Sequence, residues 1–155
     1  MKHFRLILVF ILFVLQSCGL LMVGSYPCAE YYQFIMPMDE LIEKTNAFKE
    51  ENPIYKFFSY NEKNEEEILD GYGEYFYHLY FYFEDIDQKV HCVIKKGDNS
   101  HSCRIGLVSM SESNIILGGW KSINTKDLSK EENEAIKKKF ETEILDKLGE
   151  WKRCK

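Results

Sequence analysis

The chain has 155 residues, with 25 acidic against 20 basic side chains and a formal net charge of −5. This length suits one globular domain and is too short for two comfortable ones. The acidic balance argues against a nucleic-acid-binding protein, whose affinity depends on neutralising phosphates. It also argues against a folded surface that binds anionic lipid.

The first residues have the layout of an export signal. Lys2 and Arg5 supply positive charge, and residues 6–15 follow without a polar side chain. A basic start, an apolar run of about 7–15 residues and then small residues are what a secretory signal requires. The charges stay in the cytoplasm while the apolar run enters the bilayer. We therefore expect the chain to be exported.

The end of this segment resembles the lipobox of bacterial lipoproteins. Residues 15–18 read LQSC, an aliphatic residue and two further residues, the second of them small, before a cysteine. The resemblance covers only the first 18 residues. It implies that a signal peptide, residues 1–17, is cleaved and that Cys18 receives a diacylglyceryl group. The protein would then be held by lipid on Cys18 in the bacterial cell envelope, facing the periplasm or the cell exterior.

Two other interpretations of the segment stay open. Residues 6–23 are nearly long enough for an uncleaved single-pass anchor, which needs about 20 apolar residues. Gln16 and Ser17 would then lie near mid-membrane, where polar groups are costly. Cleavage near Val23-Gly24-Ser25 would instead release a soluble protein. All three interpretations place the domain outside the cytoplasm.

The cysteine pattern predicts disulfides. The sequence contains five cysteines, which are Cys18, Cys28, Cys92, Cys103 and Cys154. With Cys18 lipidated, an even number remains in a compartment where disulfides persist. Gly97-Asp98 suits the centre of a type II′ turn, and a hairpin centred there places Cys92 opposite Cys103. We predict a Cys92–Cys103 bridge and, by elimination, a Cys28–Cys154 bridge. The alternative is free thiols, some buried as small hydrophobic side chains.

The first half of the mature chain is predicted to hold one helix and one strand. Residues 18–36 are expected to be an aromatic-rich tether and connector, and residues 37–155 a single domain. A proline at the first turn and an Asn-Pro stop predict a helix over residues 37–52. Residues 54–60 are a candidate strand, and the acidic residues 61–70 are a loop or a short helical turn.

The strand predicted over residues 75–84 alternates between two faces. One face consists of Tyr75, Tyr77, Leu79, Phe81 and Phe83. The other carries His78, Tyr80 and Tyr82, which are aromatic side chains with polar tips. Because Tyr is enriched where proteins meet, these three residues form a candidate recognition surface. The alternative is that a helix or a loop covers them as part of the core.

The second half is predicted to hold three further strands and a helix. Residues 89–96 and 102–110 form the hairpin, and residues 115–123 a last strand. Ser129 and Glu132 have the capping-box spacing, followed by an apolar stripe at helical spacing. Lys137 is expected on the solvated side of this helix. The fold class is therefore α+β, an antiparallel sheet of four to five strands flanked by an N-terminal and a C-terminal helix.

Motifs for catalysis or metal binding are weak. The His91-Cys92 and His101-x-Cys103 pairs are ligand types that zinc prefers, but the predicted register points His91 to the opposite face, leaving three ligands. The sequence contains no P-loop, dinucleotide fingerprint, nucleophile elbow or metalloprotease helix. We predict no cofactor and no metal site, and the sequence leans against an enzyme without excluding one.

Compartment and composition together predict a non-enzymatic protein-binding module of the cell envelope. Small disulfide-tied acidic lipoproteins include periplasmic immunity proteins, an analogy of compartment and fold only. The partners expected are the membrane, through Cys18, and another protein, with no nucleic acid. The competing hypothesis is a small-molecule-binding protein or an enzyme with an aromatic-lined pocket.

Overall fold

The computed structural model describes residues 26–60, 66–112 and 119–154. Its main element is a seven-stranded antiparallel sheet with the strand order β4-β5-β6-β7-β1-β9, in which β8 also pairs with β7. The strands of this sheet are β1 (Glu30–Phe34), β4 (Gly71–Tyr72), β5 (Tyr77–Phe83), β6 (Gln88–Lys96), β7 (Cys103–Glu112), β8 (Lys121–Ser122) and β9 (Trp151–Arg153). A second sheet pairs β2 (Phe58–Tyr60) with β3 (Glu66–Ile68).

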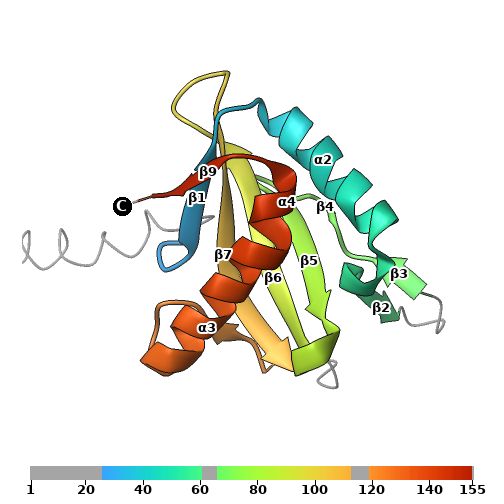
Figure 1. Ribbon diagram of the computed structural model, residues 1–155, viewed down its shortest axis with the longest axis vertical. Helices are drawn as coiled ribbons and strands as arrows, with labels where there is room; N and C mark the ends of the chain where they lie inside the picture. Colours follow the sequence, from blue (N-terminus) through green and yellow to red (C-terminus); the bar gives the residue numbers. More distant parts are fainter. Residues whose placement is uncertain (1–25, 61–65, 113–118, 155) are drawn as a thin grey trace, which may run out of the picture.

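The helices lie on one face of the main sheet (Figure 1). Helix α2 spans Met38–Glu51, and α3 spans Lys130–Phe140. A π-helical turn, Glu141–Leu145, continues α3 into the short α4, Asp146–Leu148. Two 3-10 turns, Pro53–Tyr55 and Glu84–Ile86, complete the described helical elements.

The core lies between this helical layer and the sheet. Strand β5 buries alternate residues, as a strand does when only one face is covered, whereas β6 buries six consecutive residues, from Lys89 to Ile94. The fully buried side chains with the largest volume include Tyr32, Phe34, Phe81, Phe83 and Phe140. The sheet face that carries the first four residues is called here the inner face, and the opposite one the outer face.

The predicted fold class is wrong in its strand count and in the position of its helices. A strand precedes α2 and another follows α4, so the sheet is not flanked by terminal helices, and the chain is mostly sheet. The predicted connector contains β1, which lies between β7 and β9. Burial alternates along β1, because Tyr32 and Phe34 are buried while Tyr31 and Gln33 are not.

The C-terminal helix begins as predicted and ends earlier. The hydroxyl of Ser129 accepts a hydrogen bond from the backbone N–H of Glu132, whose carboxylate accepts one from the N–H of Ser129, which confirms the capping box. Gly149 has a φ of 141°, which side-chain-bearing residues rarely adopt, and it ends the helical segment. Trp151 therefore starts β9 and does not extend the helical stripe.

The hairpin between β6 and β7 has a different register from the predicted one. Lys96 pairs with Cys103, so the turn is longer than two residues, and the N–H of Gly97 donates to the carbonyl of Ser102 at 2.9 Å. Cys92 consequently lies opposite Leu107. The register then shifts by one residue at a β-bulge, because His91 pairs with Ser109 and Val108 has no partner in β6.

Three further predictions involve the parts of the chain near the gaps. Residues 1–25, with the predicted signal and Cys18, lie outside the described residues. The strand predicted over residues 115–123 lies partly outside them, and its described part contains only β8. The acidic segment 61–70, predicted as a loop or a short helical turn, contains strand β3.

Candidate functional site

The three residues of the predicted recognition surface lie on the outer face of β5. His78, Tyr80 and Tyr82 are half-buried, whereas Leu79 and Phe81 between them are fully buried on the inner face. The alternation read from the sequence therefore holds over this strand. Neither the helices nor the hydrophobic core cover these residues, because both lie on the inner face.

His78 forms a hydrogen bond with His91, which comes from the neighbouring strand β6. The Nδ1 atom of His78 lies 2.9 Å from the Nε2 atom of His91. The two rings are nearly coplanar, at 5° with centroids 5.2 Å apart, so the nitrogens face one another edge to edge. One nitrogen donates a proton and the other accepts it, so the pair holds a single proton between the rings.

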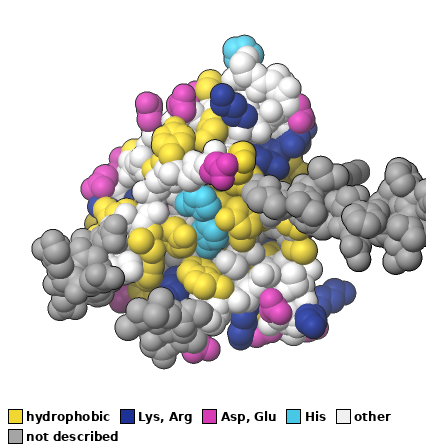
Figure 2. All heavy atoms as spheres, turned by 180° about the vertical axis from the view of Figure 1, so that it is seen from behind, with side chains coloured by type: hydrophobic (Ala, Val, Ile, Leu, Met, Phe, Trp, Pro, Cys, Tyr) yellow, Lys and Arg dark blue, Asp and Glu magenta, His cyan; other side chains and the backbone are white. Residues whose placement is uncertain are grey.

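Aromatic rings surround this histidine pair. Tyr80 stacks on His91 with centroids 4.8 Å apart, and Trp120 contacts both of these rings at 6.1 and 6.2 Å. On the other side, Tyr26 lies 5.6 Å from His91 and 6.3 Å from His78. Figure 2 shows histidine side chains near the centre of this face with hydrophobic side chains beside them. The aromatic patch consists of Tyr26, Phe76, His78, Tyr80, His91 and Trp120.

The patch is assembled from segments that are distant in the sequence. His78 and Tyr80 come from β5 and His91 from β6, while Tyr26 and Trp120 come from the segments before β1 and β8. The loop between β4 and β5 approaches His78 closely, because a Cβ at position 73 would lie 2.7 Å from its Nε2 atom. Glycine at this position therefore lets the loop lie against the ring.

Both histidines of the patch are held in the neutral form near pH 7. Burial, and second the neighbouring His78, lower the pKa of His91 to about 4. Burial also lowers the pKa of His78. Each neutral imidazole has one donor and one acceptor nitrogen, and the surrounding rings supply apolar surface. This combination suits recognition by hydrogen bonds and ring packing.

Tyr82 belongs to a different environment from the other two predicted residues. Its hydroxyl donates a hydrogen bond to Oδ1 of Asp87 at 2.8 Å. Asp87 lies in the turn after β5 with a φ of 51°. The structure thus ties Tyr82 to this turn, whereas it brings His78 and Tyr80 together.

The observed hairpin register excludes the predicted Cys92–Cys103 bridge. Cys103 pairs with Lys96, four residues along β6 from Cys92, which separates the two cysteines by about 13 Å at the usual rise of a strand. A disulfide needs Cα atoms within about 7 Å. Both thiols are buried, and burial raises the pKa of Cys103 to about 11 and that of Cys92 further.

The Cys28–Cys154 bridge stays a prediction. The four described cysteines are free thiols in the structure. Cys28 precedes β1 and Cys154 follows β9, and these two strands pair with each other. The N–H of Cys154 donates to the carbonyl of Tyr31 at 2.8 Å. The two segments that carry these cysteines therefore lie side by side.

A cavity of about 300 Å³ lies beside α2 and the start of β4, and sequence reasoning missed its polar residues. Lys49 of α2 forms a nearly buried ion pair with Asp70 and donates a hydrogen bond to the carbonyl of Tyr80 at 2.7 Å. The second oxygen of Asp70 accepts from the N–H of Tyr80 at 2.8 Å. Because these charged groups bind one another and the backbone, they fasten α2 to the sheet.

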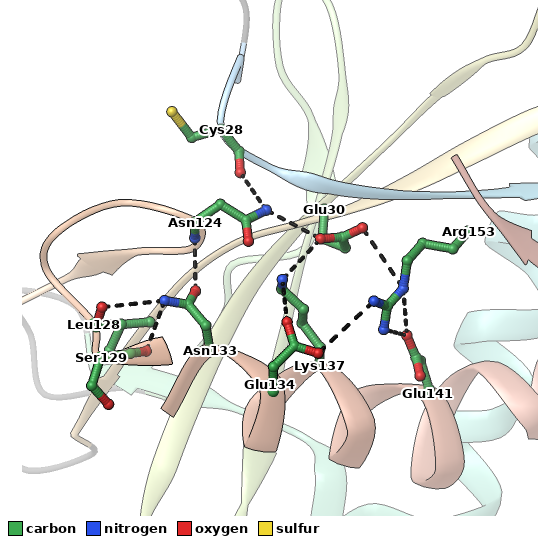
Figure 3. Close-up of polar contacts among 10 residues, drawn as sticks. All are labelled: Cys28, Glu30, Asn124, Leu128, Ser129, Asn133, Glu134, Lys137, Glu141 and Arg153. Carbon is green, nitrogen blue, oxygen red and sulfur yellow. Dashed lines mark hydrogen bonds and ion pairs between the residues drawn. The ribbon is translucent and has the colours of Figure 1, made fainter. Parts of the chain in front are cut away.

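A second polar network fastens β1 and β9 to α3 (Figure 3). Glu30 on β1 lies 3.0 Å from Nζ of Lys137 and 3.7 Å from Nε of Arg153. Lys137 also pairs with Glu134 at 3.1 Å, and Arg153 pairs with Glu141. Lys137 was expected on the solvated side of the helix, and it is buried instead. The network is structural, since each carboxylate already has a basic partner.

Neither a metal cluster among the described residues nor a known relative identifies this chain. Within the described ranges, no three His, Cys, Asp or Glu side chains are placed to hold a metal ion. Among the helices of the described part, none is long and apolar enough to cross a bilayer. No protein-family model, no curated protein and no solved structure matches the chain.

Proposed function

We propose that this chain is an exported binding protein of the bacterial cell envelope that recognises a partner protein through the aromatic patch. The observation that carries the proposal is the group of interlocking rings on the outer face of the sheet, opposite the helices. Tyr and Trp dominate the binding energy of protein interfaces because they bury large apolar areas while keeping a polar tip.

The graded exposure of the patch suits a protein partner. Trp120 is 38% exposed, His78 and Tyr80 are half-buried, and His91 between them is buried, so the patch has an exposed edge and a buried centre. The rings are held by one another and by the His78–His91 hydrogen bond. A surface that is ordered before binding loses little side-chain entropy when a partner covers it.

The surroundings of the histidines support binding over catalysis. A catalytic histidine needs a nucleophile or an orienting carboxylate within hydrogen-bond reach. Here the side-chain hydrogen bond of His91 is with His78, and aromatic rings flank it. Ser109 lies opposite His91 on β7, and among the described residues no hydrogen bond joins the two side chains. Cys92, the next residue along β6, points into the core, where burial raises its thiol pKa. The pair is therefore proposed as part of a recognition surface.

Photo-crosslinking tests this function directly. The photoreactive residue benzoylphenylalanine is placed at Trp120 in the full-length protein in the producing cell, with a matched control at Ala135, which is exposed on α3. We expect one discrete adduct from position 120 and none from position 135. The adduct should disappear when Tyr80→Ala is added, because the rest of the patch then loses its stacking partner. Equal adducts from both positions would contradict the proposal.

The envelope address is proposed from residues 1–18 and needs its own test. The basic start, the apolar run and the LQSC ending support export followed by lipidation of Cys18. In cells fed a labelled fatty acid, we expect the protein to be labelled and to sediment with membranes. Cys18→Ala should abolish both, while Cys28→Ala should change neither. Labelling that persists in Cys18→Ala would reject lipidation at this residue.

A further inference from the structure

A row of basic side chains crosses the outer face of the sheet beside the aromatic patch. Lys95 of β6 pairs with Arg104 of β7, Arg104 pairs with Gln33 of β1, and Gln33 pairs with Lys152 of β9. The four positions are in register across four adjacent strands. With neighbouring strands about 4.8 Å apart, the row spans about 14 Å. We call these four residues the basic row.

The row contains an unfavourable charge arrangement. Lys95 and Arg104 are directly opposite one another, and like charges at opposed strand positions repel. The pKa of Lys95 is lowered by burial and by the guanidinium of Arg104. In the described part of the chain, the ion pair recorded for this row is that of Arg104 with Asp98, at 2.5 Å. One carboxylate thus stands against three cations.

Arg104 also has unused hydrogen-bonding capacity. Its Nε atom is buried and has no hydrogen-bond partner among the described residues. An unsatisfied buried donor is costly, and a charged one more so. An anionic group above the row would neutralise the cations through their exposed nitrogens, and it would reach this buried donor only if the Arg104 side chain turned outward.

The charge of the outer face has the opposite sign to the net charge of the whole chain. The charged residues at outward strand positions are all basic: Lys89, Lys95, Arg104 and Lys152. The strands that the structure describes place no Asp or Glu at an outward position of the main sheet. This contrasts with the net charge of −5 for the whole chain. The charge expected of a partner bound here is therefore inferred from this basic face and not from the acidic composition of the chain.

We infer that the basic row binds an acidic segment of a partner protein that lies across the strands. An extended chain advances about 3.3 Å per residue, so four or five residues match the length of the row. Tyr31 adds apolar surface beside the row, because Nζ of Lys95 lies over its ring at 4.0 Å and the ring packs over Gly106, where a Cβ would lie 2.6 Å from it. A protein segment can contact this apolar ring and the cations at once.

The half-buried positions of Lys95 and Arg104 favour a peptide over a bilayer surface, which is reached by projecting side chains. The inference goes beyond the proposed function, since the basic row shares no residue with the aromatic patch. An experiment can therefore reject either proposal without rejecting the other.

The test uses the full-length protein in mild detergent with a hexaglutamate peptide as the probe. We expect hexaglutamate to bind with an affinity that falls as salt is added, and hexaglutamine not to bind. Lys95→Gln with Lys152→Gln should weaken binding about tenfold, since two cations are lost. The matched control is Lys44→Gln with Lys147→Gln, two exposed lysines of the helical layer, and it should bind like the unmodified protein.

Three outcomes would overturn the inference. The first is that hexaglutamate binds no better than hexaglutamine, and the second is that the row variant and its control bind hexaglutamate equally. The third is that phosphatidylglycerol vesicles bind in a row-dependent manner while hexaglutamate does not, which would assign the row to lipid. Lys95→Arg with Lys152→Arg should restore peptide binding, and thermal unfolding shows that each variant is folded. Tyr80→Ala should leave peptide binding unchanged, so a failed crosslinking experiment does not decide this one.

Discussion

The two faces of the main sheet use the same residue types for different purposes. On the inner face of β5, Leu79, Phe81 and Phe83 are fully buried under the helices. On the outer face of the same strand, His78 and Tyr80 pack against rings from other segments and keep part of their surface in solvent. Alternation in the sequence shows which residues share a face of the sheet. Which face is the core has to be judged from charged and polar side-chain ends, because the two faces of β5 are similarly hydrophobic.

The largest expected effect lies on the inner face. Phe81→Ala removes a fully buried ring and leaves a cavity under the helices, which costs about 3–5 kcal/mol of unfolding free energy. Its neighbour Tyr80→Ala is the matched control and should cost about 1 kcal/mol, since the ring is half-buried. Denaturant unfolding measures both. Equal losses would show that the outer face is a second core.

The ion pair of Lys49 and Asp70 comes next. Asp70→Asn leaves the ammonium of Lys49 nearly buried without its counter-charge, and we expect a loss of about 2–3 kcal/mol. Burial already lowers the pKa of Lys49, and Asp70 opposes that shift. The double variant Lys49→Met, Asp70→Leu should recover most of the loss, because it removes both charges. A double variant as unstable as Asp70→Asn would contradict this explanation.

The histidine pair predicts a pH dependence of the outer face. Because the pKa of folded His91 is about 4, below its ordinary value of 6.5, the neutral form stabilises the fold above about pH 6.5. This stabilisation is lost as the pH falls towards 4, by about 2 kcal/mol at about pH 5. His91→Phe should flatten the profile of unfolding free energy in this range. His101→Gln, at an exposed histidine, should leave the profile unchanged.

The smallest effect is expected for the hairpin cysteines. In a Cys18→Ala, Cys28→Ser, Cys154→Ser background only Cys92 and Cys103 remain. Reductant should leave the unfolding free energy of this variant unchanged, because the register keeps the two thiols apart. Without reductant, thiol counting should detect both cysteines once the protein is unfolded and neither of them in the folded protein. If no thiol is found, the observed register is wrong.

The sequence predicted those features that depend on neighbouring residues. The alternation over β5 identified both faces, and the spacing of Ser129 and Glu132 identified the helix start. Helix α2 likewise follows from its proline start and Asn-Pro stop. Each of these signals is contained in a window of fewer than about 20 residues, so no knowledge of the rest of the fold is required.

The features that sequence reasoning missed depend on distant partners. The sequence around β1 predicts a connector, because its partners β7 and β9 lie far along the chain and give no local signal. Helical spacing predicts that Lys137 faces solvent, because no neighbouring residue indicates that Glu30 pairs with it across the domain. The candidate site shows the same limit, since Tyr26 and Trp120 reach the histidines from two separate segments. Net charge likewise concealed a basic face on an acidic chain.

The bulge at Val108 sets the orientation of the far half of β7. It lets Leu107 point into the core and, two positions later, Ser109 lie opposite His91 on the outer face. Deleting the codon for this one residue would place Ser109 directly after Leu107, so Ser109 would still lie opposite His91 and Met110 opposite Val90. Deleting any other single residue from the middle of β7 would instead turn the remainder of the strand over, because side chains alternate with a period of two. A single in-frame deletion at Val108 should therefore be better tolerated than one elsewhere in the strand.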